Sequence, residues 1–380
     1  DQVDLNYKNP RVLLEMTRVL LFYATKGVRV FRLDAVAYLW KEASTPCVHL
    51  PQVHAVIRFF RAVLEATFPG TLILTETNVP HRENLSYLGK GNDEAHMVYQ
   101  FALPPLVLDA FLRENCNKLR QWLSELTPLT PHCAYFNFLA SHDGIGLLPA
   151  KGILTEDQRA HLERVVKERG GMVSERTSDA GTEPYELNIT YLDAIAERSL
   201  SPSQRAKKFL ASQSLLFSLP GIPGVYVHSL VGSENWSEGV SASGVYRAIN
   251  REKLLYTKLC TELDTPGSLR NLVFGGFMRM LKVRAGLKAF HPAAGFRVIA
   301  CEGPDSVLSL LRFDDENEVL VVLNASSVAA EASFDPTDLG GEPPFTDALS
   351  EKEFVSVEED TSRFVFYLEP FAVHWLIVKP

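Results

Sequence analysis

The sequence predicts an α/β fold, with a partial (β/α) barrel over residues 1–292 and an antiparallel β-sandwich over residues 293–380. Three observations support this prediction. Apolar, strand-like runs alternate with amphipathic helices through the first part of the chain, and three of the runs end in an acidic residue. Past His291-Pro292 the helical periodicity stops, and short β-rich runs separated by Gly, Pro and Asp take over.

The first elements are the clearest in the chain. Asn9-Pro10 supplies an N-cap and a proline at the first helical position, and apolar residues then recur at helical spacing until Gly27. A buried strand is predicted from Gly27 to Ala35, interrupted by Arg32 and ended by Asp34. A helix over 51–68 and a second buried strand over 71–76, ending in Glu76, repeat the pattern.

The alternation continues with a third strand over 96–101 and two helices over 105–114 and 118–126. A fourth strand over 134–140 leads into Ser141-His142-Asp143-Gly144. A polar insertion at about 149–197 follows, and an insertion of this length is usually a lid or a substrate-binding element. The remaining predicted elements are a helix over 202–217, a strand over 221–227, a helix over 268–287, and β-runs over 307–311, 319–324, 330–334, 363–368 and 373–378.

Alternating strands and helices imply a parallel sheet with right-handed crossovers, and their number fits a barrel better than an open sheet. Only five strands are readable before the β-sandwich, whereas a closed barrel of this type has eight. We therefore expect the chain to be a fragment of a longer protein. Exposed strand edges would make such a fragment fold poorly on its own and leave it inactive.

Composition excludes several classes of function. The net charge of −8 disfavours binding to nucleic acid or to anionic membranes. No apolar run reaches membrane-spanning length, and no signal-peptide pattern is present. The five cysteines are far apart in sequence, which predicts reduced packing residues in a cytoplasmic protein rather than disulfides or a zinc site. We expect no metal and no other cofactor, because no histidines have metal-ligand spacing. The sequence does not indicate the oligomeric state.

Three strand-end acids, Asp34, Glu76 and Asp143, should meet at one face of a barrel. Two carboxylates on neighbouring strand ends are what a retaining glycosidase needs, at a separation of about 5–5.5 Å. Arg32 would keep Asp34 ionised, and His142 would hydrogen-bond sugar hydroxyls. The alternative interpretation of Arg32 and Asp34, on that segment alone, is a buried structural ion pair.

These segments resemble motifs of a known family. Gly27 to Ala35 resembles the nucleophile motif of the α-amylase superfamily, Thr75-Glu76 resembles its acid/base strand, and Ser141-His142-Asp143 resembles its third motif. Segments 1–7, 142–146 and 247–251 are similar to the sucrose phosphorylase branch. The resemblance spans essentially the whole chain and implies that strands 4 to 8 of a (β/α)8 barrel are present.

By carry-over from the superfamily, Asp34 is the nucleophile, Glu76 the general acid/base and Asp143 the transition-state stabiliser, while Arg32 and His142 contact the glucosyl group. The resemblance also implies an acceptor loop around Tyr185, and segments 77–81, 183–188 and 249–253 look closer to glucosylglycerate phosphorylases. The candidates for acceptor or phosphate contact are Tyr185, Glu186, Arg247 and Arg251. Packing of the loop by Tyr185, and a solvated or structural role for the two arginines, are the alternatives.

The resemblance implies a retaining α-glucoside phosphorylase that transfers glucose from glucosylglycerate or sucrose to phosphate by double displacement, giving α-glucose 1-phosphate. The partners would be a small α-glucoside and inorganic phosphate. Alternatives are a sucrose-6-phosphate or glucosylglycerol phosphorylase, an α-glucosidase or transglucosidase of the superfamily, and an inactive fragment.

Overall fold

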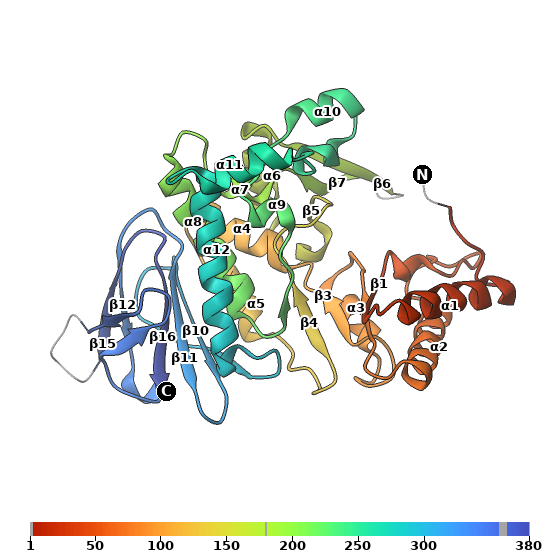
Figure 1. The fold of residues 1–380 in the computed structure, drawn as a ribbon, viewed down its shortest axis with the longest axis horizontal. Coiled ribbons are helices and arrows are strands. Elements are labelled where there is room, and N and C mark those ends of the chain that lie inside the picture. Colours follow the sequence, from red (N-terminus) through yellow and green to blue (C-terminus); the bar gives the residue numbers. More distant parts are fainter. Residues whose placement is uncertain (1–2, 179–180, 357–362, 380) are drawn as a thin grey trace. The chain divides into compact units, whose positions relative to one another are not determined.

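A computed structural model describes residues 3–178, 181–356 and 363–379. Residues Asp1 and Gln2 of the predicted N-terminal motif lie outside the described residues. The chain divides into two compact units, one made of residues 1–101 and 127–136 and the other of residues 102–126 and 137–380. Each unit is described by itself (Figure 1).

The first unit is built on parallel strands joined by helices. Strand β1 pairs with β2, β2 with β3 and β3 with β4, all in parallel register. Apolar residues from β1, β2 and α2, among them Phe31, Ile73 and Phe60, form the core of this unit. Its helices and strands are α1 (Pro10–Thr25), β1 (Val30–Leu33), α2 (Pro51–Thr67), β2 (Leu72–Thr75), α3 (His81–Leu85), β3 (Met97–Tyr99) and β4 (Ala134–Asn137).

Local sequence explains where α1 begins and ends. The Asn9 side chain accepts a hydrogen bond from the backbone N–H of Arg11, and Pro10 occupies the first turn. The helix ends before Gly27, whose φ of +91° is a conformation that glycine adopts without strain. The strand predicted after Gly27 is confirmed, and in the structure it covers Val30–Leu33, so that Asp34 follows its last residue directly.

The second unit contains the segment that we predicted as a polar insertion. That segment holds a helix, α6 (Glu156–Glu168), and an antiparallel hairpin of β6 (Met172–Ser178) and β7 (Gly181–Asn188). Short strand β5 (Ile145–Gly146) pairs antiparallel with β7. The insertion is therefore a folded element attached to the residues that follow Asp143.

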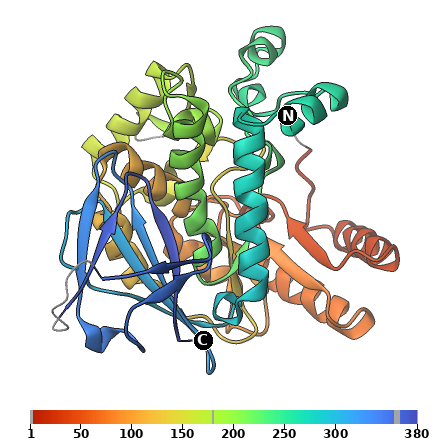
Figure 2. The same cartoon turned by 60° about the vertical axis from the view of Figure 1, so that its left-hand side comes forward.

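Two long helices, α8 (Pro202–Ser218) and α12 (Leu269–Gly286), lie side by side and pack against the C-terminal sheet of the same unit (Figure 2). The strand predicted over 221–227 is shorter in the structure: β8 covers only Ile222–Pro223, and a helix starts at Val227. The Gly224 N–H still donates to the Asn137 carbonyl at 2.7 Å, one residue past the end of β8. The other helices of the unit are α4 (Leu103–Arg113), α5 (Asn117–Ser124), α7 (Tyr191–Ile195), α9 (Val227–Leu230), α10 (Ser237–Ser243) and α11 (Tyr256–Asp264).

The C-terminal part is an antiparallel β-sandwich, as predicted. One sheet has the strand order β14-β13-β16-β11-β10-β9, and β12 pairs with β15 in the other. Leu311 and Phe366 belong to one apolar core between the sheets, whereas Leu310 and Trp375 face the helices α8 and α12. The strands are β9 (Gly295–Val298), β10 (Val307–Phe313), β11 (Glu318–Asn324), β12 (Ala330–Phe334), β13 (Phe345–Asp347), β14 (Lys352–Phe354), β15 (Phe364–Leu368) and β16 (Val373–Lys379).

Candidate active site

In the first unit, Asp34 and Glu76 follow the paired ends of neighbouring parallel strands. Leu33 is in register with Thr75, so the next residue of each strand is the acid. Two hydrogen bonds with backbone donors connect the two strand ends. The Glu76 N–H donates to the Leu33 carbonyl at 3.0 Å, and the Ala35 N–H donates to Glu76 Oε2 at 2.9 Å. Ala35 has a left-handed backbone, with φ of 46°, directly after Asp34.

Arg32 lies between the two acids. Its Nη1 atom is 2.5 Å from Asp34 Oδ1, and its Nη2 atom is 3.9 Å from Glu76 Oε1. Burial alone would lower the pKa of Arg32, but Tyr99, Glu76 and Asp34 together raise it above its ordinary value. The guanidinium therefore stays charged beside both carboxylates.

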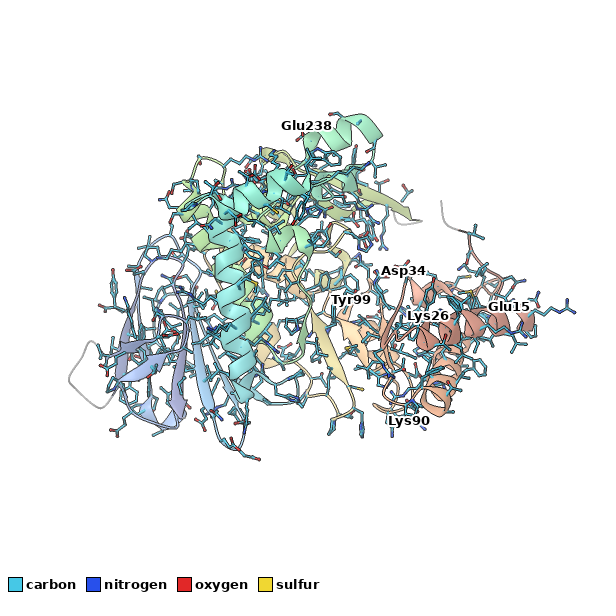
Figure 3. The ribbon with its side chains drawn as sticks, in the orientation of Figure 1. Glu15, Lys26, Asp34, Lys90, Tyr99 and Glu238 are labelled. Carbon is cyan, nitrogen blue, oxygen red and sulfur yellow. The ribbon has the colours of Figure 1, made fainter. Side chains whose placement is uncertain are left out.

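Tyr99, on β3, completes this group and was missed by the sequence analysis. Its hydroxyl accepts a hydrogen bond from Arg32 Nε at 3.1 Å, and the guanidinium also lies over its ring, 5.6 Å from the centroid. Figure 3 labels Asp34 and Tyr99. Tyr99 lies within the third predicted strand, over 96–101, but nothing in that prediction singles out its side chain.

In the second unit, Asp143 is surrounded by basic residues. Arg247 Nη1 is 2.7 Å from Asp143 Oδ1, Arg251 Nη2 is 3.4 Å from the same oxygen, and His142 Nε2 is 3.7 Å from Oδ2. The Asn250 side chain donates to the backbone carbonyls of Ser141 and Asp143 at 3.1 and 2.8 Å. Asn250 is the second residue that sequence analysis missed, and it fixes the backbone rather than the carboxylate.

The acceptor candidates occupy the same region of the second unit. Glu186, on β7, accepts two hydrogen bonds from Arg247, at 2.9 Å from Nε and 2.6 Å from Nη2. Arg251 Nε donates to the His142 carbonyl at 2.5 Å. Tyr185 precedes Glu186 and contributes to the raised pKa of Arg247, whose largest cause is the hydrogen bonding to Glu186.

The structure thus brings the predicted residues together as two groups, Arg32–Asp34–Glu76 in the first unit and a larger group in the second. The second group contains His142, Asp143, Tyr185, Glu186, Arg247 and Arg251.

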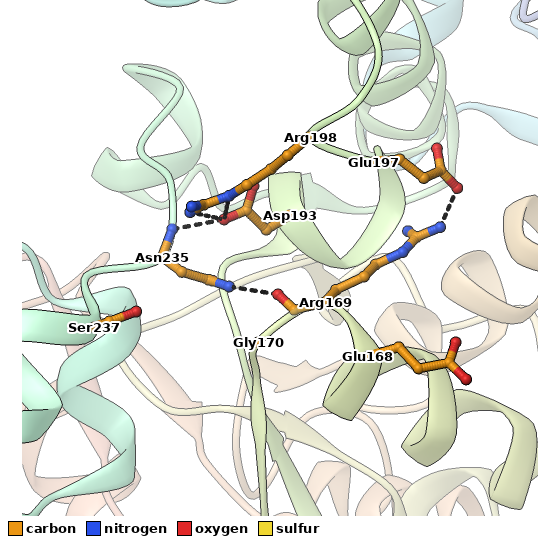
Figure 4. A pocket seen from close by; sticks show the side chains of 8 residues that line it. All are labelled: Glu168, Arg169, Gly170, Asp193, Glu197, Arg198, Asn235 and Ser237. Atoms are coloured by element: carbon orange, nitrogen blue, oxygen red, sulfur yellow. Dashed lines mark hydrogen bonds and ion pairs between the residues drawn. The ribbon is translucent and has the colours of Figure 1, made fainter.

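A separate pocket of about 400 Å³ in the second unit is lined by none of these residues (Figure 4). Its charged side chains pair with one another or, in the case of Glu168, with Arg164 one turn earlier on the same helix. Asp193, which is almost completely buried, accepts from Arg198 at 2.7 Å and from the backbone N–H of Asn235 at 2.8 Å, and Arg169 pairs with Glu197. Because the buried charges already have partners, we assign this cluster a structural role.

Among the described helices, none combines the length and the apolar character that crossing a bilayer would require.

Comparison with known proteins shows what this chain is similar to. Residues 1–147 match the Alpha amylase, catalytic domain family. A glucosylglycerate phosphorylase from Spirochaeta thermophila is 51% identical over 382 residues, covering 99% of this chain and 64% of that protein. The glucosylglycerate phosphorylase of Escherichia coli is 39% identical over 378 residues, covering 99% of this chain and 65% of that protein. The chain therefore spans a little under two thirds of the length of these relatives.

Solved structures agree on the fold. The sucrose 6F-phosphate phosphorylase from Thermoanaerobacter thermosaccharolyticum aligns with a TM-score of 0.72 and 21% identity, over 87% of this chain and 63% of that one. An α-amylase from H. orenii aligns with a TM-score of 0.66 and 15% identity, over 99% of this chain and 66% of that one. The parallel sheet followed by an antiparallel C-terminal sheet is thus an α-amylase-like fold.

Proposed function

Since this chain carries an α-amylase family segment and is related to glucosylglycerate phosphorylases along 99% of its length, we propose that it is part of a retaining α-glucoside phosphorylase. The reaction transfers a glucosyl group from an α-glucoside to inorganic phosphate and yields α-glucose 1-phosphate. Glucosylglycerate is the favoured donor, because that is the activity named for the relatives at 51% and 39% identity. Sucrose is the second candidate, since a sucrose phosphorylase from Agrobacterium vitis is 28% identical over 275 residues.

The observation that carries this proposal is the pairing of Asp34 and Glu76 at the ends of adjacent parallel strands, with Arg32 between them. Asp34 attacks the anomeric carbon while the bond to the leaving oxygen breaks, and Glu76 gives its proton to that oxygen. A phosphate oxygen then attacks the β-glucosyl ester, the Asp34 carboxylate leaves, and Glu76 takes the proton from the phosphate hydroxyl. Inversion at each step returns the α configuration.

The proposed roles of the remaining residues follow from charge. Asp143 stabilises the positive charge that develops on the sugar in the transition state, and Arg32 and His142 contact the glucosyl group. Of the two arginines near Asp143, Arg251 is the better candidate for an anionic acceptor. The two side chains are similarly exposed, but Arg247 pairs with both Glu186 and Asp143, whereas Arg251 donates to the His142 carbonyl and lies 3.4 Å from its nearest carboxylate oxygen.

Three broader statements belong to the same proposal. The parallel strands are strands 4 to 8 of a (β/α)8 barrel, and the catalytic part passes into the C-terminal β-sandwich at residues 292 and 293. The protein acts in the cytoplasm on small molecules, with no part played by nucleic acid or membranes. The chemistry requires no metal or other cofactor.

The experiment that tests the function measures release of α-glucose 1-phosphate by the purified full-length protein that contains this chain, with and without phosphate. Glucosylglycerate, sucrose, sucrose 6-phosphate and glucosylglycerol are assayed side by side. We expect turnover to require phosphate. Among the four donors, we expect glucosylglycerate to give the highest kcat/KM. Equal turnover without phosphate would instead indicate an α-glucosidase or transglucosidase, and absence of turnover with every donor would indicate that the protein is not catalytic.

A further inference from the structure

The ladder between β5 and β7 places Glu186 directly against the backbone that follows Asp143. Gly146 is in register with Glu186, and Ile145 with Leu187. A Cβ atom on Gly144 would lie 2.6 Å from Glu186 Cγ and 2.6 Å from the Leu187 carbonyl oxygen. A side chain at residue 144 would clash with these atoms. The backbone beside Asp143 therefore packs directly against the aliphatic part of the Glu186 side chain.

The Glu186 carboxylate is buried and has both oxygens occupied by one partner. Its side chain is 2% exposed, and the Arg247 guanidinium donates from Nε to Oε1 and from Nη2 to Oε2. A bidentate pair of this kind fixes the plane of the guanidinium as well as its position. With its side chain 2% exposed, this carboxylate has almost no surface on which a substrate could bind.

The remaining nitrogen of Arg247 reaches the proposed transition-state stabiliser. Nη1 is 2.7 Å from Asp143 Oδ1, so the guanidinium connects a buried carboxylate to a more exposed one. A lysine could not make this connection, because its single nitrogen cannot form a planar fork with Glu186 and also reach Asp143.

We propose that Glu186 is a positioning residue, which holds Arg247 so that its Nη1 atom stays on Asp143. The inference rests on the proposed function and changes the part expected of Glu186, from substrate contact to support of a catalytic carboxylate. It makes Arg247 the fixed counter-charge of Asp143.

Glu186→Gln tests the proposal with almost no change in shape. The amide oxygen can still accept one hydrogen bond from Arg247. The amide NH2 group, however, faces a second donor of Arg247, so one of the two hydrogen bonds between the side chains is lost. Glu183→Gln is the matched control, because Glu183 lies on the same strand and pairs with an arginine, Arg176, at 2.9 Å from Nε.

In kinetic assays, we expect Glu186→Gln to lower kcat about 10²-fold while KM changes less than about threefold, and Glu183→Gln to stay within about twofold of the wild type. The double variant Glu186→Gln/Arg247→Met should be no slower than Arg247→Met, because the two residues act through one contact. Multiplicative losses, or a rise in KM that depends on the acceptor, would overturn the proposal in favour of direct substrate contact.

A crystal structure of Glu186→Gln separates this inference from the proposed function. We expect the distance between Arg247 Nη1 and Asp143 Oδ1 to increase from 2.7 Å to beyond ion-pair range. If Arg247 keeps its place, Glu186 does not position it, whatever the activity. If the wild-type protein fails to release glucose 1-phosphate, the proposed function is wrong. The comparison of the two crystal structures would still show whether Glu186 holds Arg247 in place.

Discussion

The two proposed catalytic aspartates differ in how firmly the fold holds them. The Asp34 side chain is 49% exposed, and its described ion pair is with Arg32, two residues earlier in the chain. The Asp143 side chain is 25% exposed, lies near two arginines, and one of those arginines is itself held by buried Glu186. A nucleophile must reach the sugar, whereas an electrostatic stabiliser must keep its place, and the two environments suit these different tasks.

The largest effect should come from Asp34→Asn. The amide cannot attack the anomeric carbon, so we expect kcat to fall about 10⁴-fold or more. Because Asp34 is half exposed, the free energy of unfolding should change by less than about 0.5 kcal/mol. Initial rates and urea unfolding measure the two quantities, with Glu15→Gln on exposed α1 as the control. Activity near that of the wild type would refute the assignment of the nucleophile.

Asp143→Asn should also lower kcat, by about 10³-fold, but with a cost in stability that Asp34→Asn does not have. The substitution removes the carboxylate charge that pairs with Arg247 in a partly buried network. We therefore expect the free energy of unfolding to fall by about 1–2 kcal/mol. Denaturant titration of the two variants side by side tests the contrast. Equal stability of both variants would contradict the difference drawn between the sites.

Replacing each arginine by lysine gives a smaller effect. Lysine can restore a single ion pair such as that of Arg32 with Asp34, but not the fork between Arg247 and Glu186. We therefore expect Arg247→Lys to lower the unfolding free energy by about 1–2 kcal/mol and Arg32→Lys by less than about 1 kcal/mol. Thermal unfolding measures both variants, and the reverse order would show that Arg32 is the more tightly held arginine.

The smallest effect should come from Tyr99→Phe. The substitution removes the hydroxyl that accepts from Arg32 Nε but keeps the ring beneath the guanidinium. Loss of one hydrogen bond to a charged group would lower kcat/KM about tenfold. Steady-state kinetics test this, and a loss as large as that of Asp34→Asn would mean that Tyr99 takes part in the chemistry itself.

Much of the first group could be predicted from sequence because β1 and β2 are short apolar runs with an acid directly after each. Parallel pairing then brings Asp34 and Glu76 to the same edge without further information. The β-sandwich was likewise readable, since β10 and β11 are rich in apolar residues and are buried on both faces.

The pairing of Glu186 with Arg247 could not be predicted. The hairpin that carries Glu186 reads as a polar insertion, and its register shifts between Ser174 and Glu175, which disrupts the alternation of a regular strand. Arg247 lies 61 residues further along the chain, in a short 3₁₀ helix at Tyr246–Asn250, and no local pattern connects the two. Such pairs are set by tertiary packing.

The central claim is that Asp34 forms a covalent bond to glucose. It is tested most directly by incubating Glu76→Gln protein with α-glucosyl fluoride, whose leaving group needs no acid catalyst, and analysing its peptides by mass spectrometry. We expect the peptide that contains Asp34 to gain the mass of one glucosyl group, and phosphate to remove the label more slowly than in the wild type. Attachment at another residue, or release of fluoride with no labelled peptide, would contradict the account.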